Sequence, residues 1–185
     1  MKKKAVFLDR DGVIIKDWHH DTGNHLTKTS QIEFLQGASQ AIQKLNKHFL
    51  VILVANQSTV ARGLVSLEQA QKLNRFLQTE LEKKGARLDA VFFCPHHPDF
   101  SGNCDCRKPK KGLFLQADKA FGIDFKKSFL VGDKTSDIAA GKKVGCVTIL
   151  VQTGYGGKDA LKKIKPDFVV ADLSKAADSI INSLK

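Results

Sequence analysis

The sequence KAVFLDRDGV, residues 4–13, joins a short apolar run to a pair of acidic residues. Residues 4–8 have the length and composition of a buried strand, and Asp9 and Asp11 follow where it ends. Two acids one residue apart at the end of a strand can point into the same crevice. Asp-Gly is also common turn chemistry, so this pair alone leaves both a functional site and a plain turn open.

The same alternation of strand and helix continues along the chain. Further β-rich apolar runs lie at 49–55, 90–94, 128–131, 147–151 and 167–170. Helical patterns lie between and after them, at 37–48, 66–84, 111–121, 135–144, 157–164 and 173–184. Uniformly apolar strands that alternate with helices predict an α/β fold, a doubly wound parallel sheet covered on both faces. Ligands bind such sheets at the carboxyl ends of the strands.

Length and composition predict one globular domain over 1–185. The 185 residues are 42% hydrophobic and 26% charged, and no linker or repeat divides them. No apolar run approaches the ~20 residues that a membrane-spanning helix requires. The apolar run after the first lysines is also too short for a signal peptide. We therefore expect a cytoplasmic protein with no membrane partner, and a monomer as the default.

The chain is strongly basic, with 30 basic and 19 acidic residues and a net charge of +11. This charge is compatible with nucleic-acid binding or with a surface that attracts small anionic metabolites. The lysines occur as scattered pairs rather than as a basic arm. This distribution favours a small-molecule partner and makes nucleic acid the less favoured alternative.

A second acidic cluster follows the fourth predicted strand, where Asp133 and Asp137 come after Gly132. Gly-Asp after a strand is also compatible with a helix N-cap. Because carboxyl ends of parallel strands share one edge of a sheet, we expect Asp133 to lie near Asp9 and Asp11. These acids offer the hard oxygen ligands that Mg²⁺ prefers, and a metal with a nearby lysine would make the crevice attractive to phosphate.

The second predicted strand ends in Asn56, Gln57 and Ser58, which supply amides, a hydroxyl and backbone N–H groups suited to an anion. The third leads into a segment with Cys94, Cys104 and Cys106, together with His96 and His97. Three cysteines and one histidine form a ligand set for tetrahedral Zn²⁺, and spacing alone does not choose the histidine. We expect Cys146, at the start of an apolar strand, to be a core thiol.

In their order along the chain, these motifs resemble the haloacid dehalogenase (HAD) superfamily of phosphatases over nearly the whole length. The resemblance implies a Rossmann-like HAD core in which Asp9 attacks phosphorus to form an aspartyl phosphate, while Asp11 acts as acid and base. It further implies Mg²⁺ held by Asp9, by the backbone carbonyl of Asp11 and by Asp133. Lys108 would neutralise the transferred phosphoryl group.

The resemblance also implies a minimal cap and a structural zinc loop at about 94–108. It favours His96 as the fourth zinc ligand, beside Cys94, Cys104 and Cys106. Arg107 and Lys134 would contact substrate, with Asn56, Gln57 and Ser58 lining the phosphate site. Asp137 would orient the metal from outside its ligand set.

The Cys-Pro-His-His-Pro segment (94–98) and the Lys-Pro-Lys-Lys-Gly-Leu segment (108–113) resemble the zinc-bearing branch of the superfamily. This branch contains heptose 1,7-bisphosphate 7-phosphatases, which the segments resemble more, and histidinol-phosphate phosphatases. The resemblance to the heptose enzymes implies removal of the 7-phosphate from D-glycero-D-manno-heptose 1,7-bisphosphate, on a route to cell-surface polysaccharide. Histidinol phosphate is the alternative substrate. A nucleic-acid 3′-phosphatase or a zinc-loop nucleic-acid binder is the alternative of another class.

Two positions depart from the family pattern. Ala55 stands where the family has a Thr or Ser that donates a hydrogen bond to the phosphoryl group. Loss of one such donor typically costs ~10²–10³ in rate, so a non-catalytic homologue is a further alternative. The stretch 16–30 is also longer than expected, and we expect it to lie beside the crevice mouth and to serve substrate recognition or closure. The adjacent His19 and His20 suggest a metal site, but exposed loop histidines are the favoured interpretation.

Overall fold

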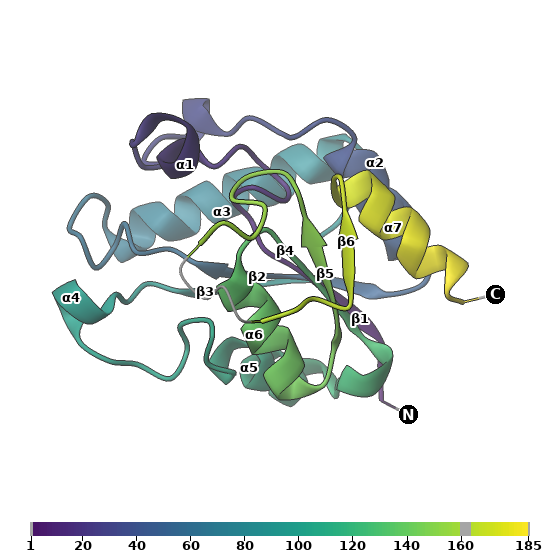
Figure 1. Cartoon of the computed structure of the whole chain (residues 1–185). Helices are drawn as coiled ribbons and strands as arrows, with labels where there is room; N and C mark the ends of the chain where they lie inside the picture. Colours follow the sequence, from purple (N-terminus) through teal and green to yellow (C-terminus); the bar gives the residue numbers. More distant parts are fainter. Residues whose placement is uncertain (1, 160–163, 185) are drawn as a thin grey trace.

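The fold is a single parallel sheet of six strands with helices on both faces (Figure 1). The computed structural model describes residues 2–159 and 164–184. The strands are β1 (Ala5–Leu8), β2 (Leu50–Asn56), β3 (Ala90–Cys94), β4 (Phe129–Gly132), β5 (Val147–Val151) and β6 (Phe168–Val170). Their order in the sheet is β3-β2-β1-β4-β5-β6. The doubly wound parallel sheet predicted from the sequence is therefore confirmed.

The longer helices agree with the predicted ones to within one or two residues at each end. They are α2 (Ala38–Asn46), α3 (Leu67–Lys83), α5 (Gly112–Phe121), α6 (Thr135–Val144) and α7 (Leu173–Asn182). Two short helices, α1 (Trp18–Thr22) and α4 (Pro98–Ser101), and two 3-10 turns, at Thr29–Gln31 and Phe125–Lys127, were not predicted. The helix predicted over 157–164 is wrong for 157–159 and for 164, which are not helical, and its residues 160–163 lie outside the described residues.

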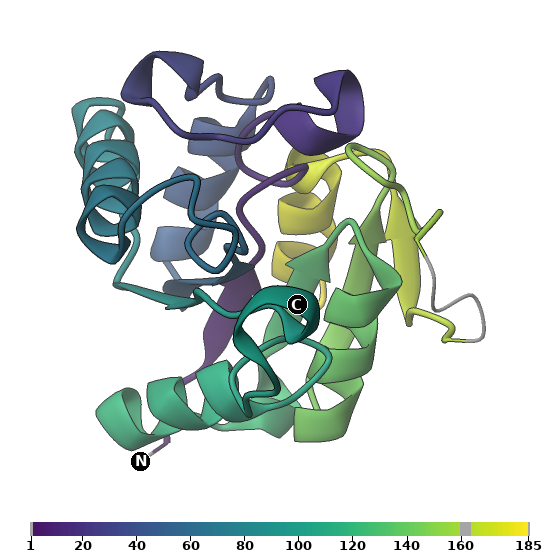
Figure 2. The ribbon, with the colours of Figure 1, turned by 90° about the vertical axis from the view of Figure 1, so that its left-hand side faces the viewer.

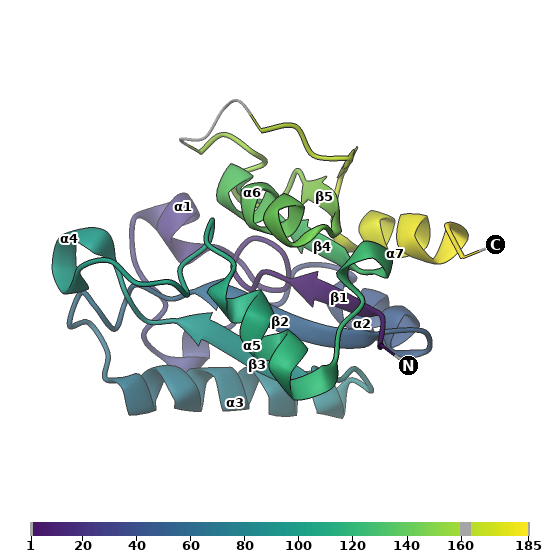
Figure 3. The ribbon, with the colours of Figure 1, turned by 90° about the horizontal axis from the view of Figure 1, so that it is seen from below.

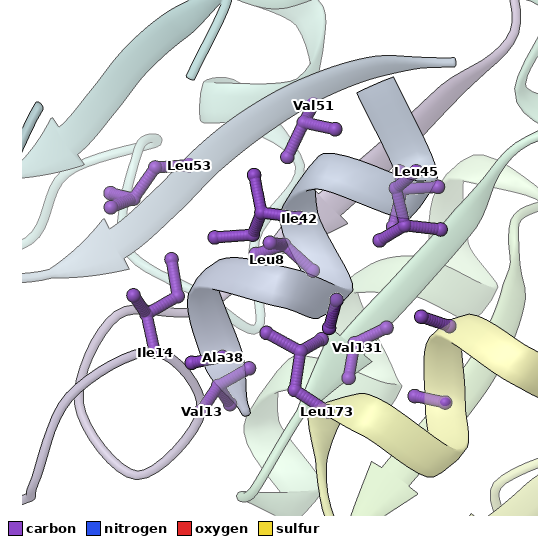
Figure 4. Packing of buried hydrophobic residues seen from close by; sticks show 14 of the residues in the cluster. Leu8, Val13, Ile14, Ala38, Ile42, Leu45, Val51, Leu53, Val131 and Leu173 are labelled. Carbon is purple, nitrogen blue, oxygen red and sulfur yellow. The ribbon is translucent and has the colours of Figure 1, made fainter. Parts of the chain in front are cut away.

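Two apolar layers hold the helices to the sheet. Helices α2, α3 and α7 cover one face, and α5 and α6 cover the other, as Figures 1 and 3 show from two directions. Figure 4 shows the first layer, where Leu8 of the central strand, Ile42 of α2 and Leu173 of α7 gather. Leu8 and Ile42 have no exposed surface, and Leu173 is 2% exposed. The predicted core thiol, Cys146, is 5% exposed in the second layer, and burial raises its pKa to about 12.

The chain reverses its direction of travel across the sheet between β1 and β4. From β1 it moves outward through β2 to β3, then returns to start β4 on the other side of β1. Such a switch point opens a crevice at the carboxyl ends of the two central strands. The segment that carries α1 lies on the same side of the sheet as α2, α3 and α7 (Figures 1 and 2). Among the described residues, no helix combines the length and the hydrophobicity needed to span a bilayer.

Candidate active site

Three carboxylates meet where the two central strands end. Asp9 follows β1, and its backbone N–H donates to the carbonyl of Val131 on β4 over 3.0 Å. Asp133 follows β4, and Asp137 lies in the first turn of α6. All three acids are buried, and Asp9 is the most exposed of them at 6%. One carboxylate oxygen of each acid lies within 4.8 Å of an oxygen of the other two. Strand pairing thus brings acids that are far apart in sequence into one cluster.

Lys108 reaches this cluster from the other side of the crevice. Its Nζ lies 2.8 Å from Asp9 Oδ1 and 2.7 Å from Asp137 Oδ1, and donates to the carbonyl of Val54 over 2.7 Å. Burial favours the neutral form of Lys108, but the two carboxylates outweigh it and raise its pKa. The residue therefore supplies a fixed positive charge beside Asp9.

The cluster still holds more negative than positive charge. Burial raises the pKa of Asp133 well above its usual range, and Asp9 and Asp137 add to that shift. Asp133 Oδ2 accepts a hydrogen bond from the backbone N–H of Tyr155 over 2.8 Å, whereas Oδ1 is buried with no partner among the described residues. Gly12, at φ +81°, lies so close that a side chain there would clash with the Asp133 carboxylate. An orphaned carboxylate oxygen among hard oxygen donors fits a divalent cation such as Mg²⁺.

Asp11 lies at the edge of the cluster, held by the preceding residue. The Arg10 guanidinium donates to its carboxylate from Nη2 over 2.9 Å and from Nε over 3.2 Å. Burial raises the pKa of Asp11, and Arg10 opposes the shift. Arg10 Nη1 donates to Asn74 Oδ1 on α3 over 3.1 Å, and Asn74 pairs in both directions with the side-chain amide of Gln57. Gln57, expected to bind substrate, lines the cleft, but its side-chain amide is hydrogen-bonded within this buried network.

Asn56 is tied to the loop that carries Lys108. Its side-chain amide donates to the carbonyl of Lys108 and accepts from the N–H of Lys108, each over 3.0 Å. Ala55 is fully buried and packs in the apolar layer, so its methyl group supplies no donor to the crevice. Ser58, three residues after Ala55, lines the cleft and is the predicted site residue in this stretch that carries a hydroxyl group. The end of β2 therefore positions Lys108 as well as bounding the crevice.

The four predicted zinc ligands come together next to this loop. The Sγ atom of Cys94 lies 2.9 Å from that of Cys106 and 3.6 Å from that of Cys104. His96 Nδ1 lies 3.3 Å from Cys106 Sγ and 3.7 Å from Cys94 Sγ. Ligands on a tetrahedral zinc ion with ~2.3 Å bonds lie roughly 3.7 Å apart, so the donor set and its size suit zinc. His97 instead caps α4 by accepting from the N–H of Asp99 over 3.3 Å.

The segment 16–30 lies beside the crevice and contacts Lys134 and Tyr155, which also line it. Asp17 caps α1 and lies 3.1 Å from Lys134 Nζ, which sits 4.3 Å from the centre of the Tyr155 ring. Burial alone would raise the pKa of Asp17, but Lys134 and the capping hydrogen bonds lower it. His19 Nδ1 lies 3.1 Å from the hydroxyl of Tyr155. His19 and His20 are exposed, and the segment lies beside the crevice.

Beside the acidic cluster lies a cleft of about 360 Å³, within the range of small-molecule sites, and Asp9 and Asp133 are not among the residues that line it. The predicted residues that line it are Asp11, Asn56, Gln57, Ser58, Arg107, Lys108 and Lys134. Trp18, in the segment expected beside the crevice, lines it too, as do Arg62 and Tyr155, to which the sequence interpretation gave no role. Arg62 lies just beyond the predicted Asn56–Ser58 stretch, but no spacing rule marks it. Tyr155 reaches the cleft only because β5 lies beside β4.

Comparisons with known proteins agree on one family. A family model described as HAD-hydrolase-like matches residues 105–176. A D-glycero-beta-D-manno-heptose-1,7-bisphosphate 7-phosphatase of Haemophilus ducreyi is 38% identical over 100% of this chain and 96% of its own length. The protein of the same name from Pasteurella multocida is 42% identical over 94% of this chain and 96% of its own length. The crystal structure of a D,D-heptose 1,7-bisphosphate phosphatase from B. bronchiseptica, complexed with magnesium and phosphate, has a TM-score of 0.85 and 31% sequence identity. The match covers 97% of this chain and 99% of that one.

Proposed function

Because this chain belongs to the heptose-1,7-bisphosphate 7-phosphatase family of HAD-like hydrolases, we propose that it removes the 7-phosphate of D-glycero-D-manno-heptose 1,7-bisphosphate. The observation that carries this proposal is the position of Asp9. Its carboxylate sits at the switch point of the sheet, 2.8 Å from Lys108 Nζ and next to the unpartnered oxygen of Asp133. A nucleophile flanked by a fixed cation and a cation-binding carboxylate is suited to phosphoryl transfer.

In the first step, a carboxylate oxygen of Asp9 attacks phosphorus, and the bond from phosphorus to O7 of the sugar breaks. Lys108 stabilises the negative charge on the transferred phosphoryl oxygens. Asp11 donates a proton to the departing O7, so the sugar leaves as an alcohol. The raised pKa of Asp11, caused by burial, favours the protonated acid that this step requires.

In the second step, water attacks the phosphorus of the aspartyl phosphate. Asp11, now ionised, takes a proton from that water, and the bond between phosphorus and the Asp9 oxygen breaks. Inorganic phosphate leaves, and both carboxylates return to their starting states. Splitting the hydrolysis in this way replaces one difficult displacement by two easier ones.

Two metals have separate tasks in this proposal. Asp9 and Asp133, with the backbone carbonyl of Asp11, would hold Mg²⁺, which supplies charge neutralisation for the phosphate. Asp137 would keep Lys108 in place rather than bind the metal. Cys94, His96, Cys104 and Cys106 would hold a structural zinc. That the enzyme is a single-domain cytoplasmic monomer without nucleic-acid partners remains a prediction from the sequence.

The test compares phosphate release from three substrates with Mg²⁺ present. Heptose 1,7-bisphosphate should be hydrolysed with the highest kcat/KM, and ³¹P NMR should show heptose 1-phosphate as the remaining product. Histidinol phosphate and a DNA 3′-phosphate should be poor substrates. A higher kcat/KM for either of these, or loss of the 1-phosphate, would reject the proposed substrate.

A further inference from the structure

The turn after β5, residues 152–157, holds Asp133 at two points. The backbone N–H of Tyr155 donates to Asp133 Oδ2 over 2.8 Å, and the backbone N–H of Gly157 donates to the Asp133 carbonyl over 2.7 Å. Oδ1 is buried and has no partner among the described residues. The turn thus occupies one carboxylate oxygen and leaves the other for a ligand that the protein itself does not supply.

Two glycines lie against the occupied oxygen of Asp133. A Cβ atom on either Gly12 or Gly154 would overlap Asp133 Oδ2, and a Cβ atom on Gly154 would lie 2.8 Å from the Cα atom of Gly12. Both glycines adopt a positive φ, +81° for Gly12 and +60° for Gly154. The backbone after β1 and the backbone after β5 therefore meet at Asp133 with no room for a side chain, which restricts rotation of the carboxylate.

Thr153 joins the same two backbone segments. Its hydroxyl donates to the carbonyl of Gly12 over 2.6 Å, while the N–H of Gly12 donates to the carbonyl of Ile15 over 2.7 Å. Hydrogen bonds at both ends of Gly12 fix the peptide planes on either side of it, and the preceding plane contains the carbonyl of Asp11. Thr153 thus orients the backbone at the carbonyl to which the proposed function gives the role of a metal ligand.

We propose that Thr153 and the turn after β5 position the divalent-cation site. The inference rests on the proposed function, in which Asp9, Asp133 and the carbonyl of Asp11 hold Mg²⁺. By holding Oδ2, the turn leaves Asp133 Oδ1 as the oxygen that binds the cation, and Thr153 fixes the direction of the Asp11 carbonyl. Thr153 is a positioning residue, because it acts through the backbone of Gly12 and does not line the cleft.

The test measures Mn²⁺ binding to the zinc-loaded protein without substrate, from the EPR signal of free Mn²⁺, and Mg²⁺ binding by competition. Mn²⁺ prefers the same oxygen ligands as Mg²⁺. Thr153→Val keeps the shape of the side chain and removes the hydroxyl, so we expect the Kd for both cations to rise about tenfold, as when other groups that orient metal ligands are lost. Thr153→Ser restores the hydroxyl and should recover most of the affinity. Asp133→Asn should abolish binding, which assigns the signal to this site.

Kinetic measurements separate positioning of the metal from a general loss of structure. In Thr153→Val, the Mg²⁺ concentration for half-maximal activity should rise about tenfold, whereas kcat at saturating Mg²⁺ should change less than about threefold. Thr148→Val is the matched control, because Thr148 is fully buried near the start of β5 and its hydroxyl donates to Asp167 over 2.7 Å. This control should lower the melting temperature and leave the Kd for Mn²⁺ unchanged.

Gly154→Ala gives a second, independent measurement. Its methyl group would overlap Asp133 Oδ2, so the Kd for Mn²⁺ should rise at least about tenfold. Gly145→Ala, at the end of α6, is the control for backbone strain. Gly145 also has a positive φ, +88°, but no described atom lies within 4 Å of its Cβ position, so this variant should lower the melting temperature without changing the Kd. Melting temperature and zinc content report on folding in each variant.

Failure of this inference differs from failure of the proposed function. If the wild type binds neither cation, or if Asp133→Asn binds Mn²⁺ as tightly as the wild type, the metal site of the proposed function fails. If the wild type binds Mn²⁺ at Asp133 and folded Thr153→Val binds it equally tightly, the function stands and the positioning role is rejected. An equal rise in the Kd of Thr148→Val would show a general loss of structure and would reject the positioning role as well.

Discussion

At the scale of single residues, the site depends on buried polar groups that hold one another. Lys108 is 2% exposed and contacts Asp9 and Asp137, while Arg10 is 5% exposed and contacts Asp11 and Asn74. Removing one member of such a network leaves the others buried without a partner, which costs more than the interaction contributed. The orientation of each catalytic side chain therefore depends on residues that do not touch the substrate.

Asn74 tests this dependence. In Asn74→Leu, Arg10 Nη1 and the Gln57 amide lose their partner, so we expect the free energy of unfolding to fall by about 2 kcal/mol. Because Arg10 then holds Asp11 less firmly, kcat should fall about tenfold with little change in KM. Denaturant unfolding and steady-state kinetics measure the two effects.

Asn46→Ala is the matched control for Asn74→Leu. Asn46 makes two hydrogen bonds to the backbone of Arg87, each 2.9 Å, away from the cleft lining. Its loss should lower stability without changing kcat. An unchanged kcat in Asn74→Leu would show that the network does not position Asp11.

The acids of the cluster were predictable because Asp9 and Asp133 each follow a recognisable strand. The partners of the other side chains were not. Gln57 was expected to face substrate, yet its amide lies against Asn74, which the helical pattern of α3 marks only as one position on its buried face. Arg62 was given no role because its environment depends on Phe100, 38 positions away in a loop whose path only the folded chain defines.

At the scale of elements, the loop between β3 and α5 is the most specialised part of the fold. Its cysteines and His96 gather at one end, and Asn56 of β2 fixes the backbone of Lys108 at the other. The loop has little regular structure apart from α4, so few backbone hydrogen bonds hold it. We infer that zinc holds the loop so that Arg107 and Lys108 face the cleft.

Cys104→Ser removes one member of the ligand set and tests this role. We expect the variant to lose most of its zinc, from about one ion per chain, and to show a lower melting temperature. Its kcat/KM should fall at least tenfold, because Lys108 is no longer held beside Asp9. Cys146→Ala, in the core, should keep the zinc. Retention of full activity by zinc-free Cys104→Ser would contradict a positioning role for the loop.

Helix predictions succeeded where a long apolar face marks the helix, as in α3, with buried Ala70, Leu73, Leu77 and Leu81. They failed for short elements. α1 has no buried residue, and its start depends on the side chain of Asp17 accepting from two backbone N–H groups. Over 157–159 the backbone forms no helix; it instead folds back, with Gly157 N–H donating to the carbonyl of Asp133 over 2.7 Å. Local pattern cannot anticipate such a contact with the site.

At the scale of the whole molecule, the edge of the sheet is joined to α6 by one acid. Asp167 accepts hydrogen bonds from the Thr148 hydroxyl over 2.7 Å and N–H over 2.8 Å, and from Lys142 Nζ over 2.9 Å. The Thr148 hydroxyl is the largest cause that lowers the pKa of Asp167 to about 2. A folded pKa below that of the unfolded chain stabilises the protein at neutral pH and loses this contribution as pH falls from about 4 to 2.

Asp167→Asn should therefore reduce the free energy of unfolding at pH 7 and have a smaller effect in acid. The side chain is 40% exposed, so solvent screening limits the electrostatic contribution to about 1 kcal/mol or less. Urea denaturation of the wild type and the variant between pH 7 and pH 3 measures the difference. A difference in the free energy of unfolding between wild type and variant that stays constant from pH 7 to pH 3 would contradict the lowered pKa of Asp167.

The alternation of apolar runs and helical patterns predicted a parallel sheet but not the order of its strands, and the crevice follows from the switch point between the two central strands. The net charge of +11 suits an anionic substrate but does not identify one. The central claim is that Asp9, at this switch point, is the nucleophile of a phosphatase.

Asp9→Asn tests that claim most directly, because it keeps the shape of the side chain and removes the nucleophilic oxygen. The measurement is kcat for phosphate release from heptose 1,7-bisphosphate with Mg²⁺, with melting temperature and zinc content as controls for folding. We expect kcat to fall at least about 10⁴-fold, as for the loss of a nucleophile in other enzymes. A folded, zinc-loaded variant that retained more than about 1% of wild-type kcat would contradict it.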